Sequence, residues 1–260
     1  MNRLTTLLFW LSFSLCLKAQ ITLGPNVSTF SVLAGSTVTN TGPTVVNGNV
    51  GVSPGSAIVG FPPGSLVNGT FHASDALAGT AQTELTTAYN LAAAAGPSTT
   101  IPAALGGLTY PPGVYNTGSS FGLTGILTLN GLGNPNAQFI FQTPSTLTTA
   151  SGSTVVLING AQASNVFWQV SSSATLGTNS FFSGNILASS SITLTTGAAL
   201  QGRALARNGA VTLDTNAVNG LGGPPPGTPA PSSLILVTTA LAGLFVYQGR
   251  KQLLKPFKTR

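Results

Sequence analysis

The stretches Thr175-Leu176-Gly177-Thr178, Thr193-Leu194-Thr195-Thr196 and Thr212-Leu213-Asp214-Thr215 repeat a Thr-Leu-x-Thr pattern at intervals of 18 and 19 residues. An earlier copy runs Thr146-Leu147-Thr148-Thr149. Short β-favouring segments that return at this interval predict the coils of a β-solenoid, because the strands of a sandwich reverse direction about every ten residues. We therefore expect a mainly β fold whose coils stack at about 4.8 Å, the spacing of hydrogen-bonded strands.

A second repeat places a glycine before alternating apolar positions. Its copies begin at Gly48, Gly69, Gly184 and Gly202, 21 residues apart in the first half of the chain and 18 apart in the second. Glycine suits the corners of coils because it tolerates backbone conformations that other residues avoid. In this repeat Leu187 and Leu205 point outward, which predicts a neighbouring segment that covers them.

Alternation along each strand sorts the side chains of the Thr-Leu-x-Thr copies into two directions. The leucines are predicted to stack inside the coils: Leu147, Leu176, Leu194 and Leu213. The opposite, outer face is predicted to comprise Thr146, Thr148, Ser173, Thr175, Ser191, Thr193, Thr195, Ala210 and Thr212, with Thr37 and Thr39 from the first coil. Asp214 falls on the same side as Thr212, so it either lies at an edge of this face or weakens it as a binding surface.

One segment departs from the β pattern. Between residues 75 and 95, Leu77, Ala81, Leu85, Ala88 and Ala92 recur at intervals of three and four, which predicts an amphipathic helix. Ser74 is placed to cap its start, and Gly96-Pro97 to end it. We expect this helix to interrupt the solenoid and to pack along its side.

The charges lie mainly at the two ends of the chain. Two of the nine basic residues fall in the first twenty positions and five in the last eleven, while Arg203 and Arg207 face the three acids Asp75, Glu84 and Asp214 in between. The nearly neutral body argues against nucleic acid as a partner, and both arginines are expected to be solvated. Cys16 is the single cysteine and lies in the amino-terminal apolar run, so the body is predicted to have no thiol to form a disulfide or bind a metal. No cofactor is expected.

The ends are typical of targeting segments. Residues 1–19 combine Arg3, an apolar run and Ala19, as in a secretory signal peptide, and the body is expected to span residues 20–221. A Gly- and Pro-rich linker follows at residues 222–231, and residues 232–260 hold an apolar segment with a basic end, which predicts a membrane anchor or sorting signal at the cell surface. A protein released into the medium is the alternative location.

Several motifs, in this order, resemble those of the microbial ice-binding protein family of the discontinuous β-helix type. They are Val50-Gly51-Val52-Ser53-Pro54-Gly55, Pro112-Gly113-Val114-Tyr115, Phe139-Ile140-Phe141-Gln142, Asn165-Val166-Phe167-Trp168-Gln169-Val170 and Gly202-Arg203-Ala204-Leu205-Ala206. The resemblance implies a right-handed triangular β-helix whose amino-terminal and carboxyl-terminal coils stack out of sequence order beside one long helix. It also implies that ice is bound on one flat face, the one that holds Thr193 and Thr212.

The tail is similar to the PEP-CTERM sorting signal, in which a Pro-Glu-Pro motif precedes a membrane helix and a basic end. The matching tripeptide here is Pro229-Ala230-Pro231, in which the glutamate is absent. Two alternatives therefore remain for the tail: a signal that a sorting protease cleaves, or a plain tail anchor. We expect a monomer.

Ice as the ligand fits the residues of the predicted face, because β-branched threonine is stiff and the strand spacing repeats it regularly. A surface or matrix protein with a structural or adhesive role is the alternative.

An enzyme is not expected, because His72 is the single histidine and the three acids do not form a carboxylate pair.

Overall fold

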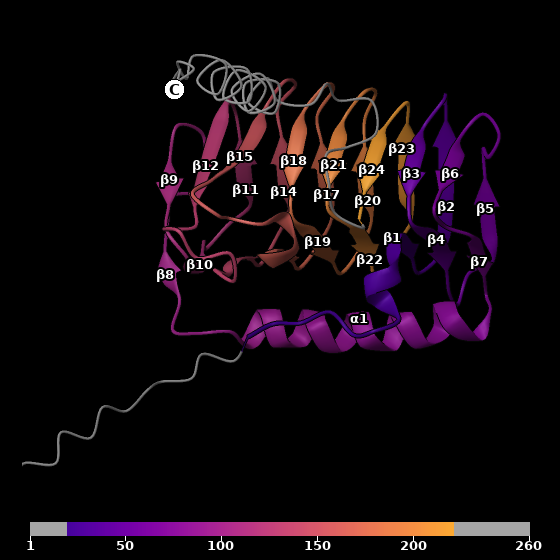
Figure 1. The fold of residues 1–260 in the computed structure, drawn as a ribbon, viewed down its shortest axis with the longest axis horizontal. Coiled ribbons are helices and arrows are strands. Elements are labelled where there is room, and N and C mark those ends of the chain that lie inside the picture. The colour runs from indigo at the N-terminus through magenta and orange to yellow at the C-terminus, as the bar shows by residue number, and fades with distance from the viewer. Residues whose placement is uncertain (1–19, 221–260) are drawn as a thin grey trace, which may run out of the picture.

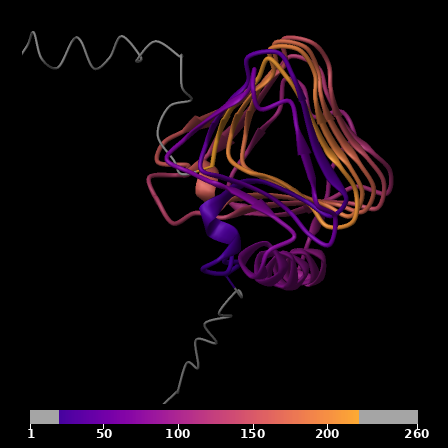
Figure 2. The same cartoon turned by 90° about the vertical axis from the view of Figure 1, so that its right-hand side faces the viewer.

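The computed structural model describes residues 20–220, which form a solenoid of triangular cross-section built from three parallel sheets (Figures 1 and 2). The predicted signal peptide, linker and carboxyl-terminal anchor lie outside these residues. Within residues 20–220, no helix is long and apolar enough to cross a membrane.

A complete coil contributes one strand to each of three sheets, called sheets A, B and C, and the coils at the two ends of the stack are incomplete. Sheet A holds, in spatial order, β7 (Phe71–Ala73), β4 (Asn49–Val52), β1 (Phe30–Ala34), β22 (Ala204–Ala206), β19 (Asn185–Ala188), β16 (Val166–Val170), β13 (Phe139–Thr143), β10 (Gly113–Asn116) and β8 (Thr99–Thr100). Sheet B holds β5 (Ala57–Val59), β2 (Thr37–Thr41), β23 (Val211–Asp214), β20 (Ile192–Leu194), β17 (Ala174–Leu176), β14 (Leu147–Thr149) and β11 (Phe121–Leu123). Sheet C holds β6 (Ser65–Val67), β3 (Val45–Asn47), β24 (Ala217–Asn219), β21 (Ala199–Gln201), β18 (Phe181–Ser183), β15 (Thr154–Ile158), β12 (Ile126–Asn130) and β9 (Thr109–Tyr110).

The coils stack out of sequence order, as the family resemblance implies. Strands β1, β2 and β3 of the first coil pair with β22, β23 and β24 of the last, in registers such as Val32 with Ala204 and Thr39 with Thr212. The chain therefore builds the amino-terminal coils, crosses to the far end of the stack and returns coil by coil (Figure 1).

The crossing is made by one helix, α1 (Ala76–Ala94), which lies along sheet A (Figure 2). At 1.5 Å per residue its 19 residues span about 28 Å, or roughly six strand spacings. Its buried face includes Ala81, Leu85 and Ala88, while Leu187 and Leu205 are covered by packing against it. The predicted helix, its place beside the solenoid and the cover over the two leucines are confirmed.

The predicted helix cap is wrong by one residue. Asp75 is the N-cap, and its side chain accepts a hydrogen bond from the backbone N–H of Ala78. Ser74 has a φ of 55°, a left-handed conformation in which the chain turns from β7 into the helix. The turn residue and the cap are therefore adjacent residues.

The segment that precedes β1 is held on sheet A by polar side chains. The carboxylate of Glu84 accepts hydrogen bonds from the backbone N–H groups of Asn26, at 2.9 Å, and Val27, at 2.8 Å, at the start of a short 3-10 helix, η1 (Val27–Thr29). The side-chain amide of Gln138 bonds the backbone N–H and carbonyl of Ile21. This segment and α1 together cover sheet A. A second 3-10 helix, η2 (Ala163–Asn165), leads into β16.

The prediction that Arg203 is solvated is wrong. Its guanidinium donates two hydrogen bonds to the carbonyl of Ser28 and one to the side chain of Asn185, and burial lowers its pKa to about 10. Arg207 lies over the ring of Tyr89, 4.4 Å from its centre. Both arginines therefore join sheet A to the segments that cover it.

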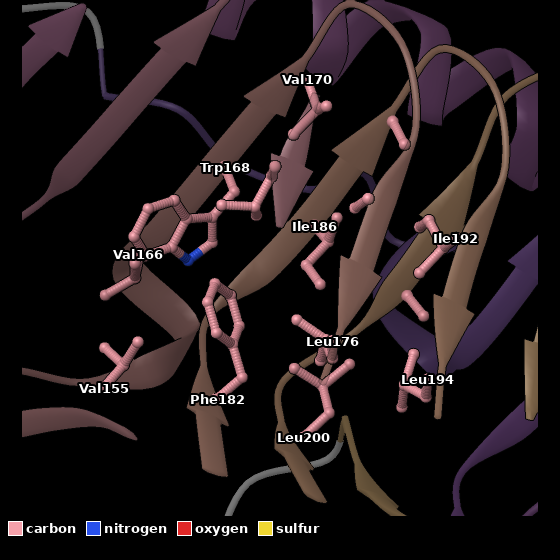
Figure 3. Close-up of a cluster of buried hydrophobic side chains, with 14 of the residues drawn as sticks. Val155, Val166, Trp168, Val170, Leu176, Phe182, Ile186, Ile192, Leu194 and Leu200 are labelled. Atoms are coloured by element: carbon pink, nitrogen blue, oxygen red, sulfur yellow. The ribbon is translucent and has the colours of Figure 1, made fainter. Parts of the chain in front are cut away.

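The interior of the solenoid is filled by apolar side chains from all three sheets (Figure 3). The four predicted leucines are all buried: Leu147, Leu176, Leu194 and Leu213. Toward β10 the coils widen to hold aromatic rings, and Phe141 and Trp168 stack at 4.2 Å between ring centres. The indole N–H of Trp168 is satisfied by the carbonyl of Ser183, so a large side chain is buried there without an unpaired polar group.

Replacement of one interior leucine tests this core. Leu194→Ala removes a fully buried side chain from the middle of the stack and is expected to lower the free energy of unfolding by about 2–5 kcal/mol. Leu91→Ala, at a position of α1 that is 47% exposed, is the matched control and is expected to change it by about 0.5 kcal/mol or less. Equal losses in urea unfolding would contradict the assignment of the interior.

The helix cap predicts a dependence of stability on pH. The hydrogen bond from Ala78, followed by the contact with His72, lowers the pKa of Asp75 in the folded protein. A carboxyl group of this kind stabilises the fold above its unfolded pKa of about 3.9, and this contribution is lost as the pH falls through the folded value. Asp75→Asn keeps an acceptor for the cap but does not titrate. The melting temperatures of parent and variant are expected to converge between about pH 5 and about pH 2, and a constant difference would count against this role.

Candidate functional site

Sheet B carries neither α1 nor the amino-terminal segment on its outer face (Figure 2). Its strands bring one outward residue from each coil into direct register. This central column reads Val59, Thr39, Thr212, Thr193, Thr175, Thr148 and Gly122. Five consecutive threonines from segments as distant as residues 39 and 212 therefore stand side by side at the spacing of strands.

The five threonine hydroxyls of the central column make no hydrogen bond within residues 20–220. Thr148 and Thr212 are exposed, while Thr39, Thr175 and Thr193 are half-buried between their neighbours. The χ1 angle of a β-branched residue in a strand is restricted. The column is therefore a row of methyl and hydroxyl groups that is free to meet an external surface.

A second column runs beside it, where the chain enters each strand of sheet B. It is formed by residues two positions earlier: Thr37, Ala210, Ser191, Ser173 and Thr146, followed by Ser120. Except at Thr37, the hydroxyls of this column have partners in neighbouring coils. Ser173 accepts a hydrogen bond from the N–H of Ser191, and Ser191 accepts one from the N–H of Ala210.

The opposite border of the central column is more polar. Thr195 donates its hydroxyl to the carbonyl of Leu176, at 2.8 Å. Asp214 lies at this border, where its carboxylate accepts hydrogen bonds from the hydroxyls of Thr196, at 2.5 Å, and Thr215, at 3.0 Å. These two bonds lower the pKa of Asp214, Thr196 having the larger effect, so the group is ionised at neutral pH. Of the two alternatives expected for Asp214, a position at the edge of the face or a weakened face, the structure shows the edge position.

The eleven predicted face residues therefore all lie on sheet B or at its borders, but they divide into two kinds. Six hydroxyls have no partner among the described residues: those of Thr37, Thr39, Thr148, Thr175, Thr193 and Thr212. Four are bonded to neighbouring coils: those of Thr146, Ser173, Ser191 and Thr195. Ala210 has no hydroxyl. Ser120 was missed, because its coil has no Thr-Leu-x-Thr copy. Its hydroxyl accepts from that of Thr146, at 2.9 Å.

The single histidine lies in a small polar cluster at the end of the stack. His72 contacts the Asp75 carboxylate at 2.6 Å and the Thr70 hydroxyl at 2.9 Å. Because Asp75 also caps α1, the cluster joins β7 to the start of the helix. Residues 20–220 contain no group of three or more histidine, cysteine or acidic side chains that could hold a metal ion.

Comparison with known proteins places this geometry in a family. The model of the family described as Ice-binding-like matches residues 32–219. The chain belongs to this family. The match begins in β1 and ends in β24, so it covers nearly all of the solenoid and the long helix between its two halves.

Similar proteins in the family come from several kinds of organism. An ice-binding protein of Nostoc sp. (strain HG1) is 57% identical over 203 residues, which are 77% of this chain and 75% of the relative. A crystal structure of an ice binding protein from an Antarctic biological consortium is 52% identical with a TM-score of 0.75, covering 78% of this chain and 91% of the other. The ice-binding protein of the Antarctic ascomycete Antarctomyces psychrotrophicus is 41% identical with the same TM-score, covering 78% and 100%.

The two kinds of hydroxyl on sheet B predict different costs of removal. Thr193→Val replaces a hydroxyl without a partner and is expected to change the free energy of unfolding by about 0.5 kcal/mol or less. Thr195→Val removes the bond to Leu176 and is expected to cost about 1 kcal/mol. Thermal and urea unfolding of the two variants check this, and a larger loss at Thr193 would contradict the division.

Proposed function

We propose that this protein binds ice through the outer face of sheet B, with the threonines of the central column as its main ligands. The observation that carries the proposal is the register of Thr39, Thr212, Thr193, Thr175 and Thr148, five adjacent coils with partner-free hydroxyls. Ice has no net charge and no unique functional group, so a ligand surface must match a lattice through many weak, regularly spaced contacts. A rigid column meets that requirement, because no side chain has to be ordered on binding.

The charges of sheet B support this use. Asp214 lies at the border, outside the central column, and its carboxylate is engaged by the hydroxyls of Thr196 and Thr215. The threonine methyl groups can order water in a cage, while the hydroxyls anchor it. The names of the relatives from Nostoc and Antarctomyces point to the same ligand.

We further propose that the domain is exported and then released or held at the cell surface by residues 232–260, as a tail anchor or a PEP-CTERM-like signal. The described chain supports this arrangement, because it ends after β24 in sheet C and begins beside sheet A, so neither end lies on sheet B. A tether at either end would leave the proposed ice face open. Detergent partition of the full chain, compared with residues 20–221, tests the anchor.

We also propose that the protein is a monomer without enzymatic activity. The outermost strands are short, three residues in β5, β6, β7 and β11 and two in β8 and β9, which disfavours pairing between molecules. The adhesive alternative would favour exposed aromatic residues in a row, and Trp168, Phe181 and Phe182 are the nearest aromatic residues to such a row. It loses support because Trp168 and Phe182 are buried and Phe181 is only partly exposed.

The proposal is tested by ice recrystallisation and thermal hysteresis assays on residues 20–221. The parent is expected to restrain crystal growth, and Thr193→Tyr to abolish this effect, because a ring standing above the column keeps the flat face from the lattice. Circular dichroism must show that the variant is folded, and Thr83→Tyr, on the exposed side of α1, is the control expected to retain activity. A parent that leaves crystals growing as in buffer would overturn the proposal in favour of a structural or adhesive role.

A further inference from the structure

At the corner where the chain enters each strand of sheet B, called here the entry corner, backbone N–H groups donate hydrogen bonds to side-chain hydroxyls of the adjacent coil. The N–H of Ser191 donates to the hydroxyl of Ser173, at 3.3 Å, and the N–H of Ala210 donates to the hydroxyl of Ser191, at 3.2 Å. At the far end the same corner holds Thr146, whose N–H lies 3.4 Å from the hydroxyl of Ser120. The corner therefore has a ladder of hydroxyls that links coil to coil.

We propose that Ser173 and Ser191 are positioning residues that hold the central threonine column in register, rather than ligands of the ice surface. This inference rests on the proposed function and deepens it, since it assigns different tasks to two columns that alternation alone places on one face. Each serine acts through the neighbouring coil: its oxygen fixes the N–H of a residue that stands two positions before a threonine of the central column.

The geometry explains why such a link is needed. Ser191 and Ala210 lie just before β20 and β23, and their carbonyls accept backbone bonds from Ala174 and Ile192. Their N–H groups are bonded by serine hydroxyls instead, so without these a corner shift would move Thr193 and Thr212 relative to each other. A partly buried N–H without an acceptor carries a desolvation cost, and the serine oxygen removes that cost in one geometry. An ice lattice cannot adapt to a misplaced ligand, so small changes in register matter.

Links on the opposite border complete the arrangement. The hydroxyl of Thr195 donates to the carbonyl of Leu176 in the neighbouring coil, and the side chain of Asn216 donates to the carbonyl of Thr195. The central column is thus bracketed on both sides by side-chain bonds between coils, while its own hydroxyls are left free. We expect its flatness to depend on both borders.

The test compares Ser191→Ala, Ser191→Thr and Ser190→Ala in residues 20–221. Thr146 occupies the equivalent position of another coil, where its hydroxyl donates to that of Ser120, so the corner admits a threonine. Threonine also keeps the hydroxyl oxygen that would accept from the N–H of Ala210. Ser190 is the neighbouring control, because its hydroxyl has no hydrogen bond within the described residues. The readouts are amide hydrogen exchange of Ala210 by nuclear magnetic resonance and ice recrystallisation inhibition.

Ser191→Ala is expected to speed exchange of the Ala210 amide by about fivefold, the equivalent of one lost hydrogen bond, and to weaken ice activity. Ser191→Thr is expected to restore both, and Ser190→Ala to change neither. In a Thr212→Ala background, Ser191→Ala is expected to add little further loss of ice activity, because its effect passes through that threonine.

Three results would overturn the inference. Loss of ice activity in Ser191→Ala with unchanged Ala210 exchange would make Ser191 a direct ice ligand. Faster exchange with full ice activity would show that the link is not needed for the surface. A parent without effect on ice would remove the proposed function itself, a failure that is recognised before any variant is compared.

Discussion

The parallel pairing of the first coil with the last is the constraint on which this structure depends. Because β1, β2 and β3 pair with β22, β23 and β24, the solenoid is closed in its middle by contacts between residues about 170 positions apart. Chain entropy opposes such closure, so many contacts must form together before it is repaid. The same pairing places Thr39 beside Thr212 and makes the threonine column continuous across the join.

The elements around sheet A follow from this topology. A chain that must return from the far end of the stack needs a rigid crossing, and α1 supplies it while covering Leu187 and Leu205. The few charged groups of the body are used mainly at this cover: Glu84 bonds the 3-10 helix before β1, and Arg203 bonds Ser28. Sheet B is left nearly free of charge as a result. The separation of a covered, charged side from an open, neutral one is what a binding surface for a neutral lattice requires.

Much of this organisation could be predicted from the sequence. Spacings of 18 and 19 residues predict a solenoid, and alternation within Thr-Leu-x-Thr assigns the buried leucines and the outward threonines. Hydrogen-bond partners could not be predicted in this way. Ser173 and Thr175 have the same direction along their strand, and only the position of the next coil shows that one hydroxyl is bonded and the other is free. Arg203 was misjudged for a similar reason, because its partner Ser28 comes from a segment 175 residues away.

The direct test of the central claim is a high-resolution crystal structure of residues 20–221 in a lattice that leaves sheet B open to solvent. If the column is a rigid template, Thr39, Thr148, Thr175, Thr193 and Thr212 will share one rotamer, and ordered waters will repeat between their hydroxyls at the strand spacing of about 4.8 Å. Mixed rotamers, or waters without this repeat, would contradict the account.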